Sequence, residues 1–185
     1  RLLDIGCGNG RYLFVLQKLG WQTYGIEPNS VSSGYARDEL QLNVETGDLL
    51  NYKCEGKFFD VITMWHSLEH LYEPIPTLKE VKRVLKDDGL LVIAIPNIDS
   101  FAAKVFKENW YQLEVPIHLI AFSPDSITRM LDSAGFNVKK IYYDRRNSPL
   151  SRSLRNLKGG KYRLLSKLSR FKVLIKMFNF ILAMF

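Results

Sequence analysis

Two kinds of hydrophobic pattern alternate along residues 1–143. Short, nearly continuous apolar runs predict buried strands of a parallel sheet at 2–5, 23–26, 42–45, 59–64 and 90–95, with an alternating edge strand at 136–143. Stretches with a helical pattern predict helices at 11–19, 30–39, 76–85, 101–110 and 124–134. This order predicts an α/β fold with a doubly wound, mostly parallel sheet and helices on both of its faces.

Three glycines follow the first predicted strand, in the segment Asp4-Ile5-Gly6-Cys7-Gly8-Asn9-Gly10. Glycine lets the backbone turn sharply and lets a ligand approach main-chain amides, so the segment predicts a nucleotide-type ligand. A dinucleotide fingerprint would need its third glycine at position 11, which is Arg11, and NAD is therefore disfavoured. The carboxylate of Asp4 favours a ligand with a cationic centre over one with two phosphates.

The segment 3–10 resembles motif I of the class I S-adenosylmethionine (SAM) dependent methyltransferases, a family with a Rossmann-like fold. Later segments resemble further motifs of the family, in the same order and at similar spacing: 25–28, 46–49, 59–70 and 85–90. Within the family, the sequence is most similar to the small-molecule branch that includes the ubiquinone-pathway methyltransferases. The resemblance covers residues 1 to about 143.

The resemblance implies a SAM-dependent methyltransferase that releases S-adenosylhomocysteine. In the family, the acid at the position of Glu27 binds both ribose hydroxyls, and the acid at the position of Asp48 accepts from the adenine amine. The residues expected to contact SAM are Asp4, Gly6, Cys7, Gly8, Gly10, Glu27, Pro28, Asp48, Leu49, Met64 and Trp65. The expected acceptor is a small molecule or a lipid- or saccharide-linked group, methylated on oxygen. Two alternatives stay open: a catalytically degenerate SAM-binding partner protein and an NAD-dependent oxidoreductase.

Three side chains with acid/base or metal-binding chemistry, His66, Glu69 and His70, follow the fourth predicted strand. We predict that His66 takes the proton of an acceptor hydroxyl, with His118 as the second candidate. Ubiquinone-type O-methyltransferases carry a Glu-x-x-Glu-His metal site here, but His66 replaces the first Glu, and we assign no metal ligands. The alternative for Glu69 and His70 is a structural role, in which they cap the following helix or satisfy the backbone of their loop, and the alternative for His118 is a hydrogen bond to the backbone.

The net charge of +7 is concentrated at the end of the chain, because residues 151–185 contain nine Lys or Arg and no acid. Apolar residues in 164–182 recur at intervals of three and four, which predicts a basic amphipathic helix. We expect a SAM-binding domain at 1–150, with a lid or substrate segment at about 97–122, and a helical appendage at 151–185. Residues 161–185 suit a peripheral membrane contact, a homodimer interface or packing on the domain, and no nucleic-acid partner is expected.

The chain has two cysteines, Cys7 and Cys54, and no disulfide framework is indicated. This favours a reducing compartment. The sequence shows no signal peptide and no apolar run of membrane-spanning length. We therefore expect a cytoplasmic protein, which would be peripheral at the inner membrane surface if the appendage binds lipid. The first residues already have the pattern of a strand, so native residues are expected upstream.

Overall fold

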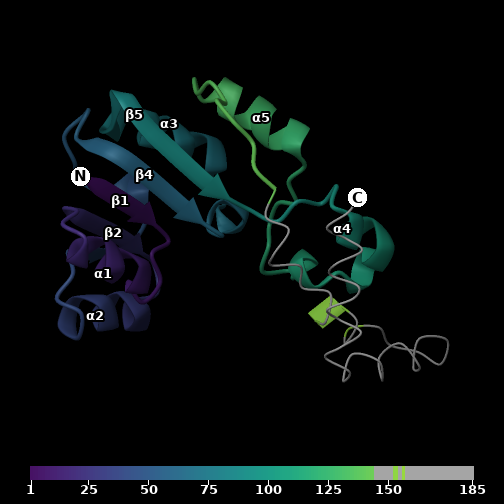
Figure 1. The fold of residues 1–185 in the computed structure, drawn as a ribbon, viewed down its shortest axis with the longest axis horizontal. Helices are drawn as coiled ribbons and strands as arrows, with labels where there is room; N and C mark the ends of the chain where they lie inside the picture. Colours follow the sequence, from purple (N-terminus) through teal and green to yellow (C-terminus); the bar gives the residue numbers. More distant parts are fainter. Residues whose placement is uncertain (144–151, 154–155, 157–185) are drawn as a thin grey trace. The chain divides into compact units, whose positions relative to one another are not determined.

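The computed structural model describes residues 1–143, 152–153 and 156, which belong to two compact units (Figure 1). The first unit contains Arg1–Ile95 and Ile127–Val138. The second contains Pro96–Ser126 and the described residues from Lys139 onward. The predicted appendage, with its helix at 161–185, lies outside the described residues except for 152–153 and 156.

A parallel sheet forms the centre of the first unit, and the described residues contribute five strands to it (Figure 1). The strands are β1 Leu2–Ile5, β2 Thr23–Glu27, β3 Val44–Thr46, β4 Phe59–Trp65 and β5 Leu85–Ala94. Their spatial order is β3-β2-β1-β4-β5, so the chain adds strands on one side of β1 and then continues on the other side. The carboxyl ends of β1 and β4 therefore mark a topological switch point, at which doubly wound sheets bind their ligands.

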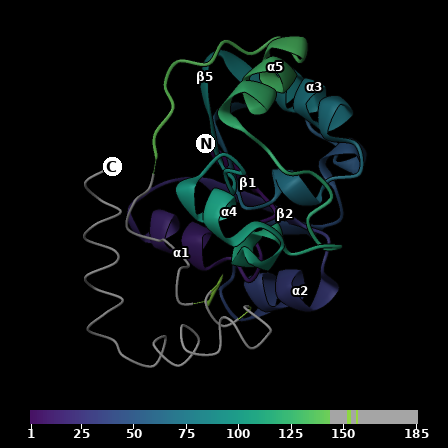
Figure 2. The same cartoon turned by 90° about the vertical axis from the view of Figure 1, so that its right-hand side faces the viewer.

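Helices connect the strands and cover both faces of the sheet. Between successive strands lie α1 Arg11–Lys18, α2 Ser30–Asp38 and α3 Pro74–Val84. Helices α1 and α2 lie on one side of the sheet and α3 on the other (Figure 2). Right-handed crossovers produce this arrangement, because the direction in which strands are added reverses between β3 and β4. The Rossmann-like fold class expected from the motifs is confirmed.

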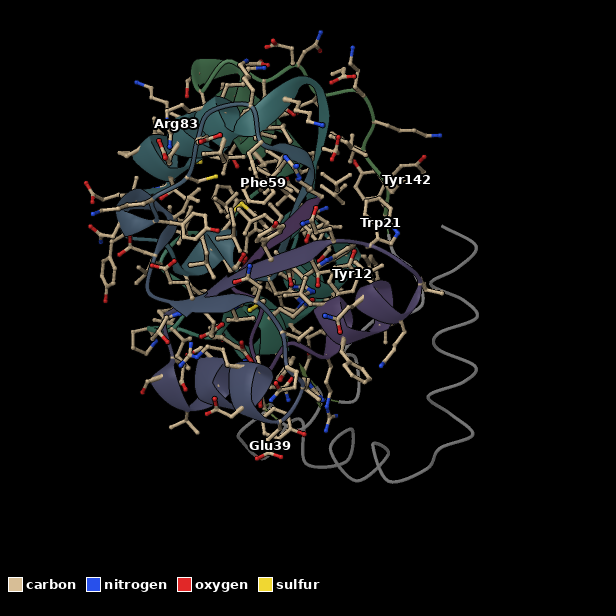
Figure 3. The ribbon with its side chains drawn as sticks, turned by 90° about the vertical axis from the view of Figure 1, so that its left-hand side faces the viewer. Tyr12, Trp21, Glu39, Phe59, Arg83 and Tyr142 are labelled. Atoms are coloured by element: carbon tan, nitrogen blue, oxygen red, sulfur yellow. The ribbon has the colours of Figure 1, made fainter. Side chains whose placement is uncertain are left out.

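The central strands are buried because their side chains are apolar on both faces of the sheet. Leu3, Phe59 and Ile62 are each 0% exposed. Phe59 lies in the interior of the first unit, whereas Arg83 and Glu39 lie at its periphery (Figure 3). The near-continuous apolar runs of β1 and β4 thus have the environment that a buried parallel strand requires.

Three strand predictions differ from the structure. Strand β3 spans Val44–Thr46 rather than 42–45. Strand β5 begins at Leu85 rather than at residue 90, and residues 87–89 form an irregularity within the strand: Phe59 of β4 pairs with Leu85, and Val61 then pairs with Leu90. The edge strand predicted at 136–143 is wrong, since none of these residues is in a strand. The alternation gives the segment one apolar and one polar face. A strand also needs a neighbouring strand whose backbone N–H and C=O groups are free to form hydrogen bonds with it. The sheet observed in the described residues is entirely parallel.

The second unit begins where β5 ends. Asn97 forms a bridge with Phe122, and Ile98 N donates to the Phe122 carbonyl at 2.9 Å. The intervening chain contains α4 Phe101–Phe106 and two short 3-10 turns, η3 Lys107–Asn109 and η4 Tyr111–Leu113. The helix predicted at 101–110 is shorter than expected because Lys107 adopts a φ of 49°, which does not continue an α-helix. A small apolar core forms around Ala103, Phe106 and Trp110.

Helix α5, Pro124–Ser133, starts in the second unit and continues into the first. Its start is capped reciprocally: Ser126 N donates to Ser123 Oγ at 3.1 Å, and Ser123 N donates to Ser126 Oγ at 2.8 Å. Gly135, with a φ of 83°, follows its end. Both ends agree with the sequence prediction. Within the described part of the chain, no helix combines the length and hydropathy needed to cross a membrane.

Candidate functional site

Asp4 of β1 lies at the switch point of the sheet. Its side chain is 2% exposed and accepts a hydrogen bond from Thr63 Oγ1 of β4 at 2.6 Å. Burial raises the pKa of Asp4 from 3.8 to about 6; the Thr63 hydrogen bond opposes this shift, and the charge of Glu27 adds to it. Burial destabilises the ionised form of a carboxyl group, and a positively charged ligand bound beside it stabilises that form.

The three glycines of the loop after β1 have different surroundings, although all have a positive φ of 76°, 55° and 76°. A Cβ on Gly6 would lie 2.6 Å from Ser67 Cβ, and a Cβ on Gly10 would lie 2.6 Å from Leu42 Cδ1. A Cβ on Gly8 would meet no described atom within 4 Å. Gly6 and Gly10 therefore permit close packing inside the protein, whereas Gly8 borders open space that a ligand can enter.

Glu27, at the end of β2, joins the glycine loop to the sheet. Its Oε2 accepts from Gly8 N and its Oε1 accepts from Asn29 N, both at 2.8 Å. A carboxylate offers about four lone-pair sites, so about two remain after these bonds. This capacity matches the two hydroxyls of a ribose cis-diol, the role that the family resemblance implies for Glu27.

Asp48, after β3, is held by its own loop. Its carboxylate accepts from Asn51 N at 3.1 Å and from Asn51 Nδ2 at 3.0 Å. These bonds cap the short turn η1 Leu49–Asn51, in which the Leu49 side chain is 1% exposed. Asp48 itself is exposed, as is Pro28 after β2. The structure therefore leaves the Asp48 carboxylate accessible to a further donor.

Two predicted cofactor residues, Cys7 and Met64, have side chains that belong to the core. Met64 is 0% exposed and Cys7 is 8% exposed. The Cys7 sulfur lies 2.7 Å from the place a Cβ on Gly25 would occupy. Burial, with the charges of Asp4 and Glu27, raises the pKa of Cys7 to about 12. Cys7 is thus a packed neutral thiol, and the backbone of both residues is the part that would face a ligand.

An aromatic pair lies at the same edge of the sheet. Trp65, the last residue of β4, meets Tyr12 of α1 edge to face, with ring centroids 5.6 Å apart. Tyr12 is 37% exposed and Trp65 is 40% exposed. The sequence prediction included Trp65 but missed Tyr12 and Thr63. Tyr12 stands in the first turn of the helix after the glycine loop, and Thr63 is a polar residue inside an apolar strand; both signals were present in the sequence.

His66 follows β4 directly and has a strained backbone. Its φ of 52° lies in the left-handed region, which is uncommon for residues other than glycine and often occurs at functional sites. Its Nδ1 lies 3.5 Å from Oε1 of Glu69. The Glu69 side chain is 1% exposed, whereas that of His66 is 58% exposed. Neither oxygen of Glu69 receives a hydrogen bond from a described residue, so this carboxylate depends on charge partners such as the His66 ring.

The remaining two predicted residues lie in different units. His70 belongs to the same turn as Glu69, η2 Leu68–His70, so the first unit brings His66, Glu69 and His70 together. His118 belongs to the second unit. Its Nδ1 donates to the Gln112 carbonyl at 2.8 Å, and its Nε2 lies 3.3 Å from Glu114 Oε2. These contacts favour a role for His118 in holding the segment 112–118 over a role as base.

Comparison with known proteins agrees with this architecture. A family model described as a methyltransferase domain matches residues 1–141. The chain belongs to this methyltransferase family, as a class I SAM-dependent member with SAM as its cofactor. A SAM-dependent methyltransferase from Thermotoga maritima, described as a possible histamine N-methyltransferase, is 27% identical, with a TM-score of 0.63 over 75% of this chain and 64% of that one. The resemblance drawn from the motifs is confirmed.

Curated relatives share part of their length with this chain. Ubiquinone biosynthesis O-methyltransferase of Actinobacillus pleuropneumoniae serotype 7 is 33% identical over 107 residues, which cover 52% of this chain and 46% of the relative. The protein of the same name from Cereibacter sphaeroides is 28% identical over 148 residues, which cover 74% of this chain and 60% of the relative. The chain thus spans about half the length of the first of these relatives and three fifths of the second.

Proposed function

We propose that this protein transfers the methyl group of SAM to a hydroxyl group of a small-molecule acceptor. The observation that carries the proposal is the His66–Glu69 pair, with 3.5 Å between Nδ1 and Oε1, directly after β4 at the ligand-binding edge of the sheet. A hydroxyl acceptor must lose a proton when it is methylated, so a base beside the acceptor favours oxygen over nitrogen as the target. The two curated relatives, both described as O-methyltransferases, support this choice.

The cofactor end of the site is formed by three groups of the first unit. SAM, when bound, supplies an activated methyl group on a sulfonium. The buried Asp4 carboxylate stabilises positive charge on the ligand. The free acceptor capacity of Glu27 receives the ribose hydroxyls, and the exposed carboxylate of Asp48 receives the adenine amine. Gly8 leaves space for the ligand beside its backbone. We also propose that Pro28, Trp65 and Tyr12 contact the bound SAM.

At the acceptor end, His66 takes the proton. The hydroxyl oxygen forms a bond to the methyl carbon, the bond from that carbon to sulfur breaks, and the hydroxyl proton passes to the exposed imidazole. The Glu69 carboxylate, 3.5 Å away, stabilises the positive charge that His66 then carries and fixes the ring orientation. The strained φ of His66 holds the ring at the end of β4, where the acceptor must meet the methyl group.

The donor set also bears on the metal site that the family resemblance implies for ubiquinone-type enzymes. Within the first unit, Glu69 and His70 have potential ligand atoms within 4.8 Å of each other, and the Glu69 oxygens lack hydrogen-bond donors among the described residues. These two side chains would hold a divalent ion if one binds, and the ion would then supply charge stabilisation. We propose that His66 acts as a base, and the experiment that follows also tests whether methyl transfer requires a metal.

A matched pair of acceptors tests the proposed reaction. Catechol and o-phenylenediamine have the same shape but present hydroxyl and amino groups. With deuteromethyl-labelled SAM and the chelator-treated full chain, mass spectrometry is expected to find labelled methyl on catechol and little on the diamine. Preferential methylation of the diamine would contradict the oxygen target, and SAM binding without transfer to any acceptor would indicate a degenerate binding protein. Activity that returns only with added divalent cations would assign Glu69 and His70 as metal ligands and would contradict the role of the His66–Glu69 pair as a base.

A further inference from the structure

Thr63 is a polar residue in the middle of an apolar strand. Its neighbours in β4, Ile62 and Met64, are each 0% exposed, and Thr63 itself is 2% exposed. In the β1–β4 ladder its partner is Asp4, which is also 2% exposed. Partner residues on neighbouring strands place their side chains on the same face of the sheet. The two polar side chains therefore meet in the interior, where polar groups need hydrogen bonds.

The geometry of the Thr63 hydroxyl favours the ionised form of Asp4. Its Oγ1 lies 2.6 Å from Asp4 Oδ1 and 3.5 Å from the carbonyl oxygen of Leu3. A hydroxyl has one proton to donate, and the shorter distance is typical of a bond from a hydroxyl to a carboxylate. When a proton of Asp4 occupies the short contact, Thr63 is left with the long one. The ionised carboxylate thus receives the stronger hydrogen bond.

The other neighbours of Asp4 do not supply a compensating positive charge. Burial raises the pKa of Asp4, the hydrogen bond from Thr63 lowers it, and the charge of Glu27 in β2 raises it further. Burial and the charge of Asp4 raise the pKa of Cys7 in the glycine loop to about 12 and also raise that of Tyr12 in α1. Both groups are therefore neutral near neutral pH. Among these neighbours, Thr63 is the one that stabilises the negative charge of Asp4.

We propose that Thr63 is a positioning residue: its hydrogen bond keeps the Asp4 carboxylate ionised, and the ionised carboxylate stabilises the positive charge of bound SAM. S-adenosylhomocysteine lacks the sulfonium charge, so its binding depends less on the ionisation of Asp4. The preference for SAM over S-adenosylhomocysteine then falls as the pH falls and Asp4 gains a proton. The inference rests on the proposed function, which places SAM beside Asp4, but binding measures it without methyl transfer.

Calorimetric titrations of the full chain with SAM and S-adenosylhomocysteine, between about pH 5 and pH 8, test the proposal. The ratio of the two affinities cancels groups that affect both ligands equally. In the wild type we expect the preference for SAM to fall by up to about 10-fold per pH unit below about pH 6, the pKa of Asp4. The pH at which this fall begins is the transition pH. In Thr63→Val, which keeps the shape of the side chain and removes the hydroxyl, we expect a transition pH about 1 unit higher.

Two variants control for the change in packing. Thr63→Ser keeps a hydroxyl and should restore the wild-type transition pH. Thr23→Val makes the same change in β2, at a threonine that is 6% exposed and whose Oγ1 has no hydrogen-bond partner among the described residues. It should leave the transition pH unchanged. If Thr63→Val does not fold, Thr63→Cys takes its place; a thiol donates weakly, so the transition pH should move in the same direction.

The charges of His66 and His70 also increase as the pH falls, so Asp4→Asn separates their effect from that of Asp4. This variant is expected to show no transition, and a transition that persists in it would overturn the proposal. Equal transition pH values in the wild type and Thr63→Val would also overturn it, as would a shift that Thr63→Ser reproduces in full. Methyl transfer to catechol with an unshifted transition would refute only this inference. A shifted transition without methyl transfer would refute only the proposed function.

Discussion

Replacing Asp4 with asparagine is expected to stabilise the protein without ligand by up to about 3 kcal/mol near pH 8, and to give no gain near pH 4. The native pKa of Asp4 is raised from 3.8 to about 6. Between these values the folded state holds the proton more tightly than the unfolded chain, so the free energy of unfolding falls as the pH rises and stays lower above the window. Asparagine has no charge to bury. Urea denaturation of both proteins at the two pH values measures the difference.

The same substitution is expected to weaken SAM binding more than S-adenosylhomocysteine binding, because SAM carries the additional sulfonium charge that Asp4 stabilises. Asp60→Asn is the matched control. The partly exposed Asp60 carboxylate forms an ion pair with Lys86, which lowers its pKa, so its loss should give no stabilisation at either pH. If Asp4→Asn instead leaves both the pH dependence of unfolding and the SAM affinity unchanged, the buried charge is not part of the cofactor site.

Replacing His66 with asparagine is expected to lower kcat for catechol about 10²- to 10⁴-fold, the usual contribution of a general base. Asparagine suits the test because it tolerates the left-handed φ of 52° at this position better than most residues do. SAM affinity should stay within about 2-fold of the wild type, since His66 is assigned to the acceptor and not to the cofactor. Single-turnover rates and calorimetric titration measure the two effects separately.

An acceptor with an acidic hydroxyl provides the decisive control for His66. Nitrocatechol is already largely ionised at neutral pH and needs no base. We expect His66→Asn to retain most of its activity with nitrocatechol while losing it with catechol, and Glu69→Gln to show a smaller loss with the same pattern. A loss that is equal for the two acceptors would assign His66 to positioning, and its role as base would be wrong.

The sheet was predictable because each central strand is a nearly continuous apolar run, and such a run has few alternatives to burial between helices. The strand predicted at 136–143 was wrong because the alternation of apolar and polar residues is a property of that segment alone. Strand pairing also depends on a second segment elsewhere in the chain that can form backbone hydrogen bonds with it. The shortened helix α4 has a similar origin, since the left-handed Lys107 that follows it reflects the packing of the second unit around Trp110.

The candidate site was predictable at the level of motifs but not of individual contacts. The pattern around Gly6, Gly8 and Gly10 indicated a ligand, yet no sequence pattern distinguishes the two glycines that serve packing from the one that borders open space. Similarly, Glu27 was assigned from resemblance to the ribose, while its two hydrogen bonds to backbone amides depend on how β2 meets the loop. Distances between segments far apart in sequence decide such contacts.

We propose that the first unit binds SAM through Asp4, the glycine loop and Glu27. Calorimetric titration of SAM, S-adenosylhomocysteine and NAD into the wild type and Glu27→Gln can confirm or refute this binding mode. We predict that the wild type binds both adenosyl ligands and not NAD, and that Glu27→Gln binds both about 10-fold or more weakly because charged hydrogen bonds are lost. Binding of NAD, or adenosyl-ligand affinities that Glu27→Gln leaves unchanged, would contradict it.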